Sequence, residues 1–222
     1  MADDYMRAHL NNAPPEPLHA VNDNDTIVSE DQAIAVDNMI ELTAESAVRA
    51  LLNALGVDEG EHTDNTPARV AKAWHDMLWG YRENPADHLD TSFPAPTDPG
   101  LVIVHGIRLV STCAHHMLPF TGHATVAYRP SPGQRIVGLS KLARVIQGYA
   151  ARLQVQEQIG TQTVGAITER LNPSGAVVVI TATHDCMRLR GVADAGAATT
   201  TEARHGLLTE PELALVYQSH RA

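Results

Sequence analysis

Two short segments of the 222-residue chain contain both of its cysteines and three of its twelve histidines: Cys113-Ala114-His115-His116 and His184-Asp185-Cys186. Thiolate and imidazole form a soft donor set that suits Zn²⁺. Two cysteines and up to three histidines leave the number of protein ligands open. Four ligands would make a closed structural site, whereas a catalytic site keeps one position open for water. Because adjacent histidines cannot easily bind one ion together, we expect one of the first pair to be a ligand and the other to serve in proton transfer.

The second segment follows a β-branched run that predicts a strand continuing towards Leu189. His184 and Cys186 are two residues apart on that strand and are therefore expected to face the same way. Two interpretations compete with a metal site. The cysteines could be buried and inert beside surface histidines, or they could form a disulfide, which a cytosolic compartment disfavours.

Basic and polar groups cluster near predicted helix starts, where free N–H groups and the helix dipole favour anions. The candidates for binding a phosphate are Arg69, Lys72, Lys141, Arg144, Arg188 and Arg190. Gln156 and Glu157 lie in a break between two predicted helices, where a carboxylate could pair with two donors of a guanine edge. The competing interpretation of all these residues is ordinary solvated surface polarity.

The elements that must position these groups follow from the periodicity of apolar residues. The pattern predicts helices over 37–56 and 66–81, a loop over 84–100, strands over 101–112, 123–129 and 136–138, helices over 142–153 and 164–171, and a strand from 176. We therefore expect an α+β fold. Residues 1–36 are expected to be a disordered acidic tail, 37–100 an N-terminal helical region and 101–222 the catalytic domain.

The formal net charge of −10 argues against nucleic-acid and membrane-surface partners, which prefer basic faces. Residues 1–65 hold 14 acids and 2 bases, so the acidity precedes the candidate site. No run of 18 apolar residues and no secretory signal is present in the sequence, which favours a cytoplasmic location without a membrane span.

Five motifs together resemble the GTP cyclohydrolase I family, in its order and spacing over roughly residues 37–218. They are Thr66-Pro67-Ala68-Arg69-Val70-Ala71-Lys72, Ser111-Thr112-Cys113-Ala114-His115-His116, Val137-Gly138-Leu139-Ser140-Lys141-Leu142-Ala143-Arg144, Gln154-Val155-Gln156-Glu157 and His184-Asp185-Cys186-Met187-Arg188-Leu189-Arg190-Gly191. The resemblance implies the tunnelling fold, an antiparallel sheet with paired helices. It also implies a barrel of subunits, a homodecamer of two pentamers, with sites shared between subunits.

The implied reaction is hydrolysis of GTP at C8, loss of formate and recyclisation to 7,8-dihydroneopterin triphosphate, the first step of pterin and folate biosynthesis. By the same resemblance, Cys113, His116 and Cys186 are expected to bind zinc, and His115 and His184 to transfer protons. Glu157, with its neighbour Gln156, is expected to recognise guanine, and Ser140 to act near the ribose. Lys141, Arg144, Arg190, Arg69 and Lys72 are expected to contact the triphosphate. Of these residues, His115, His184, Ser140 and Gln156 are assigned to catalysis.

Two positions depart from the family's pattern. Ala114 stands where the family usually has glutamate, and Glu202 places a negative charge where the family is neutral. These departures leave two alternatives beside the main interpretation. One is a pathway-specific paralogue that opens the GTP ring for a specialised metabolite, and the other is a non-catalytic paralogue that binds GTP.

Overall fold

The computed structural model describes residues 30–57 and 60–222. Its contacts divide the chain into two compact units, Met1–Asp76 and Met77–Ala222. Most of the tail expected over 1–36 lies outside the described residues, and the first described helix begins at Glu30, before the expected start near Asp37. None of the helices in the described part of the chain is long and apolar enough to cross a membrane.

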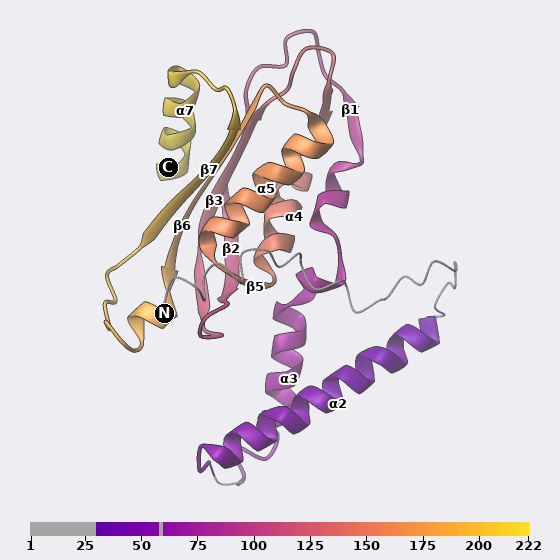
Figure 1. Ribbon diagram of the computed structural model, residues 1–222, viewed down its shortest axis with the longest axis vertical. Helices are drawn as coiled ribbons and strands as arrows, with labels where there is room; N and C mark the ends of the chain where they lie inside the picture. Colours follow the sequence, from indigo (N-terminus) through magenta and orange to yellow (C-terminus); the bar gives the residue numbers. More distant parts are fainter. Residues whose placement is uncertain (1–29, 58–59) are drawn as a thin grey trace, which may run out of the picture. The chain divides into compact units, whose positions relative to one another are not determined.

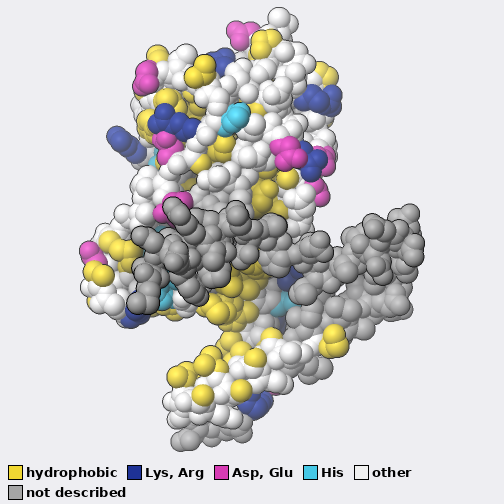
Figure 2. Space-filling view, in the orientation of Figure 1, with side chains coloured by type: hydrophobic (Ala, Val, Ile, Leu, Met, Phe, Trp, Pro, Cys, Tyr) yellow, Lys and Arg dark blue, Asp and Glu magenta, His cyan; other side chains and the backbone are white. Residues whose placement is uncertain are grey.

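The first unit contains two helices, α2 (Glu30–Ala54) and α3 (Thr66–Met77). As predicted, α2 stops near Gly56, whose φ of +70° lets the amide of Val57 return to the carbonyl of Leu52. Large apolar side chains remain exposed on α2, among them those of Met39 and Leu51, and Figure 2 shows hydrophobic side chains on the surface of this helix.

The second unit begins at Met77, whereas the change in composition predicted a boundary near Leu101. Two short 3₁₀ helices account for the difference, η1 (Trp79–Arg82) and η2 (Pro85–Leu89). The guanidinium of Arg152 donates to the carbonyls of Gly80 and Glu83 at 2.7 and 3.0 Å. This segment therefore packs with the sheet domain.

A five-stranded sheet in the order β5-β2-β3-β6-β7 forms the framework of the second unit (Figure 1). The strands are β2 (Val102–Cys113), β3 (Pro119–Arg129), β5 (Leu153–Gln154), β6 (Gly175–His184) and β7 (Thr199–Gly206). All neighbours are antiparallel except β5, which pairs in parallel with the last two residues of β2. A separate antiparallel pair joins β1 (Ser92–Pro94) to β4 (Arg135–Val137).

Helices cover both faces of this sheet. α4 (Leu139–Ala150) and α5 (Gln156–Leu171) lie on one face, and α7 (Glu210–Arg221) lies on the other (Figure 1). Alternate residues of β6 divide between the two faces: Val178 and Ile180 belong to the α4–α5 core, and Val177 and Val179 to a smaller core under α7. This alternation follows from the two-residue period of a strand.

Two features of the fold differ from the sequence predictions. The strand expected to continue towards Leu189 ends at His184, and a short helix, α6 (Asp185–Arg188), follows it. Helix α7 was not predicted, although Thr209 and Glu212 form a capping box that marks its start. Glu212 also forms an ion pair with Arg129 of β3, which fastens the beginning of this helix to the sheet.

Candidate functional site

A tight turn between β2 and β3 brings a thiol and two imidazoles together. Cys113 ends β2 and is buried, and its carbonyl accepts a hydrogen bond from the amide of Met117 at 2.8 Å. Met117 adopts a φ of +53°, which reverses the chain within four residues. The Nδ1 atoms of the exposed His115 and His116 consequently lie 3.9 and 3.7 Å from Cys113 Sγ.

These three side chains have the spacing of metal ligands. One donor atom of each lies within 4.8 Å of the others. Sulfur and nitrogen bound to one tetrahedral zinc ion are about 3.6 Å apart, given Zn–S and Zn–N bonds of about 2.3 and 2.0 Å. Both sulfur–nitrogen distances are close to this value. The group can therefore hold a metal ion, and its spacing does not by itself separate His115 from His116.

Cys186 approaches the same place from the other segment. It lies in α6, just after the end of β6, and its thiol lies near enough to Cys113 for the two to interact electrostatically. Burial and the neighbouring Cys113 raise the pKa of the Cys186 thiol. The expectation that His184 and Cys186 share one strand is wrong because β6 ends at His184. Cys186 is nevertheless a neighbour of Cys113, although the described group with metal-ligand spacing contains only Cys113, His115 and His116. Both cysteines are free thiols rather than a disulfide.

His184 is held by two side chains. Its ring stacks on Phe120, with centroids 4.5 Å apart and planes 7° from parallel. The two residues are cross-strand partners on β3 and β6. Its Nε2 lies 2.8 Å from Oε1 of Gln156. Burial lowers the pKa of His184, and the nearby carboxylate of Glu157 raises it.

The buried amide of Gln156 determines which nitrogen of His184 carries the proton. Its Nε2 donates to the carbonyls of Ile180 and Thr199, each at 3.0 Å, and to the hydroxyl of Thr201 at 3.1 Å. Only an N–H group can face two carbonyl oxygens, so Oε1 must face the histidine. His184 then donates from Nε2 and keeps Nδ1 for another partner.

The other predicted site residues fall into two groups. Glu157 is exposed at the start of α5 beside His184, and Nη1 of Arg190 lies 3.3 Å from Nε2 of His116. Arg190 therefore borders the group of Cys113, His115 and His116, and Glu157 borders His184. Arg188 instead pairs with Asp185 within α6.

Ser140 and Lys141 lie on the first turn of α4, at the far end of this helix from Cys113, and Arg144 lies in its middle. The helix leads directly into β5, which pairs with Thr112 and Cys113, so its last turn is the one near the group. Its 12 residues span about 18 Å at 1.5 Å per residue. Arg69 and Lys72 are exposed on α3 in the other unit, where Lys72 forms an ion pair with Asp76.

Phe120 was missed in the sequence because β3 was expected to begin only at His123. The strand in fact begins at Pro119, a position that proline tolerates because the first residue of a strand needs no ladder donor. A Pro-Phe pair that begins three residues after His116 was the available signal.

The departure at Glu202 lies on the face of β7 opposite to Gln156. Thr201 faces Gln156, and its neighbour Glu202 accepts hydrogen bonds from Arg204 and from Tyr217 of α7. Burial opposes ionisation, but these hydrogen bonds lower the pKa of Glu202. Its charge is therefore compensated within its own face of the sheet.

Glu202→Gln is accordingly expected to leave the KM for GTP within about twofold of the wild-type value. Steady-state kinetics of formate release measure this directly. Glu157→Gln serves as the contrasting variant, since its carboxylate is exposed beside His184. A large fall in KM for Glu202→Gln would mean that its charge does oppose the triphosphate.

Comparisons with known proteins agree with this geometry. The family described as GTP cyclohydrolase I matches residues 44–216. GTP cyclohydrolase 1 of Desulforamulus reducens is 46% identical over 169 residues, which cover 76% of this chain and 89% of that protein. GTP cyclohydrolase 1 of Mycolicibacterium paratuberculosis is 47% identical over 165 residues, or 74% and 80% of the two chains. The Streptomyces avermitilis protein of the same name is 45% identical over 172 residues, or 77% and 85%.

Among solved structures, the apo form of the archaeosine synthase QueF-Like covers 52% of this chain and 99% of its own, with a TM-score of 0.40 and 16% identity. That likeness is too distant to support a conclusion. The match over residues 44–216 and the identity to three relatives over most of their length are decisive. The chain belongs to the GTP cyclohydrolase I family, and its α+β architecture is the tunnelling fold of that family.

Proposed function

We propose that residues 101–222 form the catalytic domain of a GTP cyclohydrolase that holds zinc with Cys113, His116 and Cys186. The reaction is hydrolysis of GTP at C8 with release of formate and rearrangement to 7,8-dihydroneopterin triphosphate. The observation that carries the proposal is the group of Cys113, His115 and His116, with the Cys186 thiol as a neighbour of Cys113, at the end of the sheet where Gln156 orients His184. The thiols must stay reduced, which supports a cytoplasmic location.

The donor set fits zinc because Cys113 and the imidazoles have tetrahedral spacing and a second thiol, that of Cys186, neighbours Cys113. When bound, zinc would lower the pKa of water to near neutrality and so supply the nucleophile for C8. A histidine that binds an ion through Nδ1 carries its proton on Nε2, so His116 would then no longer accept from Arg190. The Arg190 guanidinium would then be free to bind the phosphates of GTP.

Histidines 115 and 184 supply the proton transfers that ring opening needs. His184 is held by Gln156 with Nδ1 unused by that contact, and Phe120 keeps its ring in one plane. His115 is exposed beside Cys113 and can exchange protons with substrate and solvent. Glu157, exposed in the first turn of α5, is placed to accept hydrogen bonds from the guanine edge. Gln156 acts by positioning, since its buried amide is occupied by protein groups.

The phosphate-binding residues support a site shared between subunits. Lys141 and Arg144 form no ion pair among the described residues, and Lys141 lies near the far end of α4 from Cys113. Since the family resemblance implies sites shared between subunits, we assign them, with Ser140, to the site of a neighbour. Arg69 and Lys72 are assigned to the triphosphate as well.

The edges of the sheet support the same assembly. Within the described residues, β7 has no partner on its outer side, and β2 is paired with β5 only at Thr112 and Cys113. Unpaired strand edges are templates for pairing with another chain. We therefore propose a barrel in which β7 of one subunit meets β2 of the next, within a decamer of two pentamers.

The direct test incubates the purified, zinc-loaded protein with GTP and measures formate together with the fluorescent pterin formed by oxidation. Both products are expected in equal amounts. Formate without pterin would identify a paralogue that stops at an opened ring. GTP binding without formate would identify a non-catalytic paralogue and contradict the proposal.

A further inference from the structure

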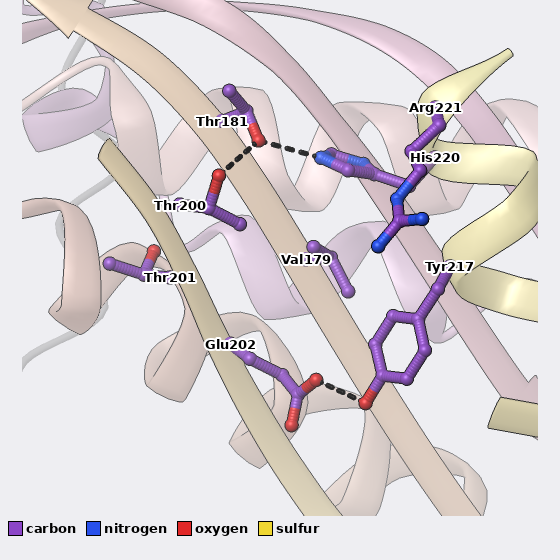
Figure 3. Close-up of a pocket in the computed structure, with 8 residues that line it drawn as sticks. All are labelled: Val179, Thr181, Thr200, Thr201, Glu202, Tyr217, His220 and Arg221. Carbon is purple, nitrogen blue, oxygen red and sulfur yellow. Dashed lines mark hydrogen bonds between the residues drawn. The ribbon is translucent and has the colours of Figure 1, made fainter. Parts of the chain in front are cut away.

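A series of hydrogen-bonded polar side chains lies between α7 and the sheet and has no role in the reaction described above. His220, in the last turn of α7, is buried, and its Nδ1 lies 2.9 Å from the hydroxyl of Thr125 on β3. Its Nε2 lies 2.9 Å from the hydroxyl of Thr181 on β6, which lies 2.8 Å from that of Thr200 on β7 (Figure 3). One histidine thus links three strands of the sheet to the C-terminal helix.

Neighbouring groups keep this histidine neutral. Burial, the nearby His123 on β3 and Arg221 on its own helix all lower the pKa of His220. The ring of His123 lies 4.6 Å from that of His220, and its Nε2 lies 3.2 Å from the carbonyl of His220. A neutral imidazole donates from one nitrogen and accepts at the other, so it can join hydroxyls on both sides.

His220 and Gln156 contact the same segment of β6 and β7. It consists of three consecutive cross-strand pairs of β6 and β7: Ile180↔Thr201, Thr181↔Thr200 and Ala182↔Thr199. In the central pair, Thr181 contacts His220 and Thr200 contacts Thr181. The flanking pairs supply the described acceptors of the Gln156 Nε2 group: the backbone carbonyls of Ile180 and Thr199 and the hydroxyl of Thr201.

We propose that His220 is a positioning residue for the reaction of this enzyme. From the face of the sheet that α7 covers, it fixes the separation and twist of β6 and β7. This fixes the position of the Gln156 amide, whose Oε1 lies 2.8 Å from Nε2 of His184. His184 is itself the last residue of β6, four positions after Ile180. The proposal rests on the proposed role of His184, and it gives the C-terminal helix a function in catalysis rather than in folding alone.

The test compares His220→Leu with His220→Gln, whose amide can still donate and accept near Thr181. A cavity of about 380 Å³ lined by His220, Thr200, Tyr217 and neighbouring side chains leaves room for either side chain (Figure 3). For His220→Leu, kcat is expected to fall about tenfold or more, as for other losses of residues that orient a reactive group. The KM for GTP, zinc content and assembly size are expected to stay unchanged, and His220→Gln to recover much of kcat.

Two further variants separate positioning from folding. Thr200→Val removes the last hydroxyl in the hydrogen-bonded series of His220, Thr181 and Thr200 without altering α7. A smaller fall in kcat at constant KM is expected. Gln218→Leu is the matched control on the exposed side of the same helix, where no change is expected. An unchanged kcat in a folded His220→Leu protein would overturn the proposal, and so would a loss of activity explained by lost zinc or altered assembly.

Hydrogen exchange followed by mass spectrometry gives a readout that does not depend on activity. Peptides covering 199–206 are expected to exchange faster in His220→Leu than in the wild type, because β7 is held less firmly. Unchanged exchange would contradict the proposal. If the wild-type protein released no formate, the proposed function would fail, while the exchange data would still decide whether His220 holds this strand.

Discussion

Purified Cys186→Ala protein is expected to contain no zinc and to release no formate from GTP above background. Cys186 reaches the Cys/His group from α6, while the other donors come from the turn after β2. Its loss would leave only ligands from one four-residue turn, which cannot enclose an ion tetrahedrally. Metal content measured by elemental analysis, together with formate release, tests this directly.

His115→Ala is the matched control within the same group. It is expected to retain zinc and to lose activity by about 10²–10⁴-fold, the usual contribution of a general acid or base. The two imidazoles lie at similar distances from Cys113 Sγ, so this variant and His116→Ala together decide which of them is the ligand. A zinc-free His115→Ala protein would reverse the assignment, and a zinc-loaded, active Cys186→Ala protein would remove Cys186 from the site.

Gln156→Met is expected to lower kcat about 10- to 100-fold while zinc content stays the same. Methionine fills a similar volume but offers His184 no acceptor and the carbonyls of β6 and β7 no donor. His184 would lose the partner that fixes its proton on Nε2. The KM for GTP is expected to change little, because the buried amide contacts protein groups only.

Gln158→Met is the control for this variant, since Gln158 is exposed on the same turn of α5. It is expected to behave as the wild type in kcat, KM and metal content. If Gln156→Met instead raised KM and left kcat intact, Gln156 would be a substrate-binding residue, as its neighbour Glu157 is proposed to be.

Much of the framework follows from local patterns. The β-branched run from Leu101 predicts β2 because branched side chains suit an extended backbone, and the apolar stripe from Leu142 predicts α4 because its spacing matches a helical face. The Cys-x-x-His spacing at the end of a strand likewise predicts two donors that can point at one ion. These features depend on residues that are near one another in the sequence.

The features that escaped prediction depend on tertiary contacts. The end of β6 at His184 is determined by α6 and its contacts with β3, not by the β-branched run that precedes it. The role of Gln156 requires knowledge of which carbonyls face its amide, and these come from strands 24 and more residues away. A glutamine at a helix start has the same local signature whether it is buried or exposed.

The contact between Cys113 and Cys186 has a topological consequence. The two thiols are separated by 73 residues, a loop that contains β3, α4, α5 and β6. An ion held by both sulfurs would bind the folded chain and not the unfolded chain, in which the two thiols are far apart, so its binding free energy would add to the free energy of unfolding. Zinc would then stabilise the whole sheet domain as well as activate water at one end of it.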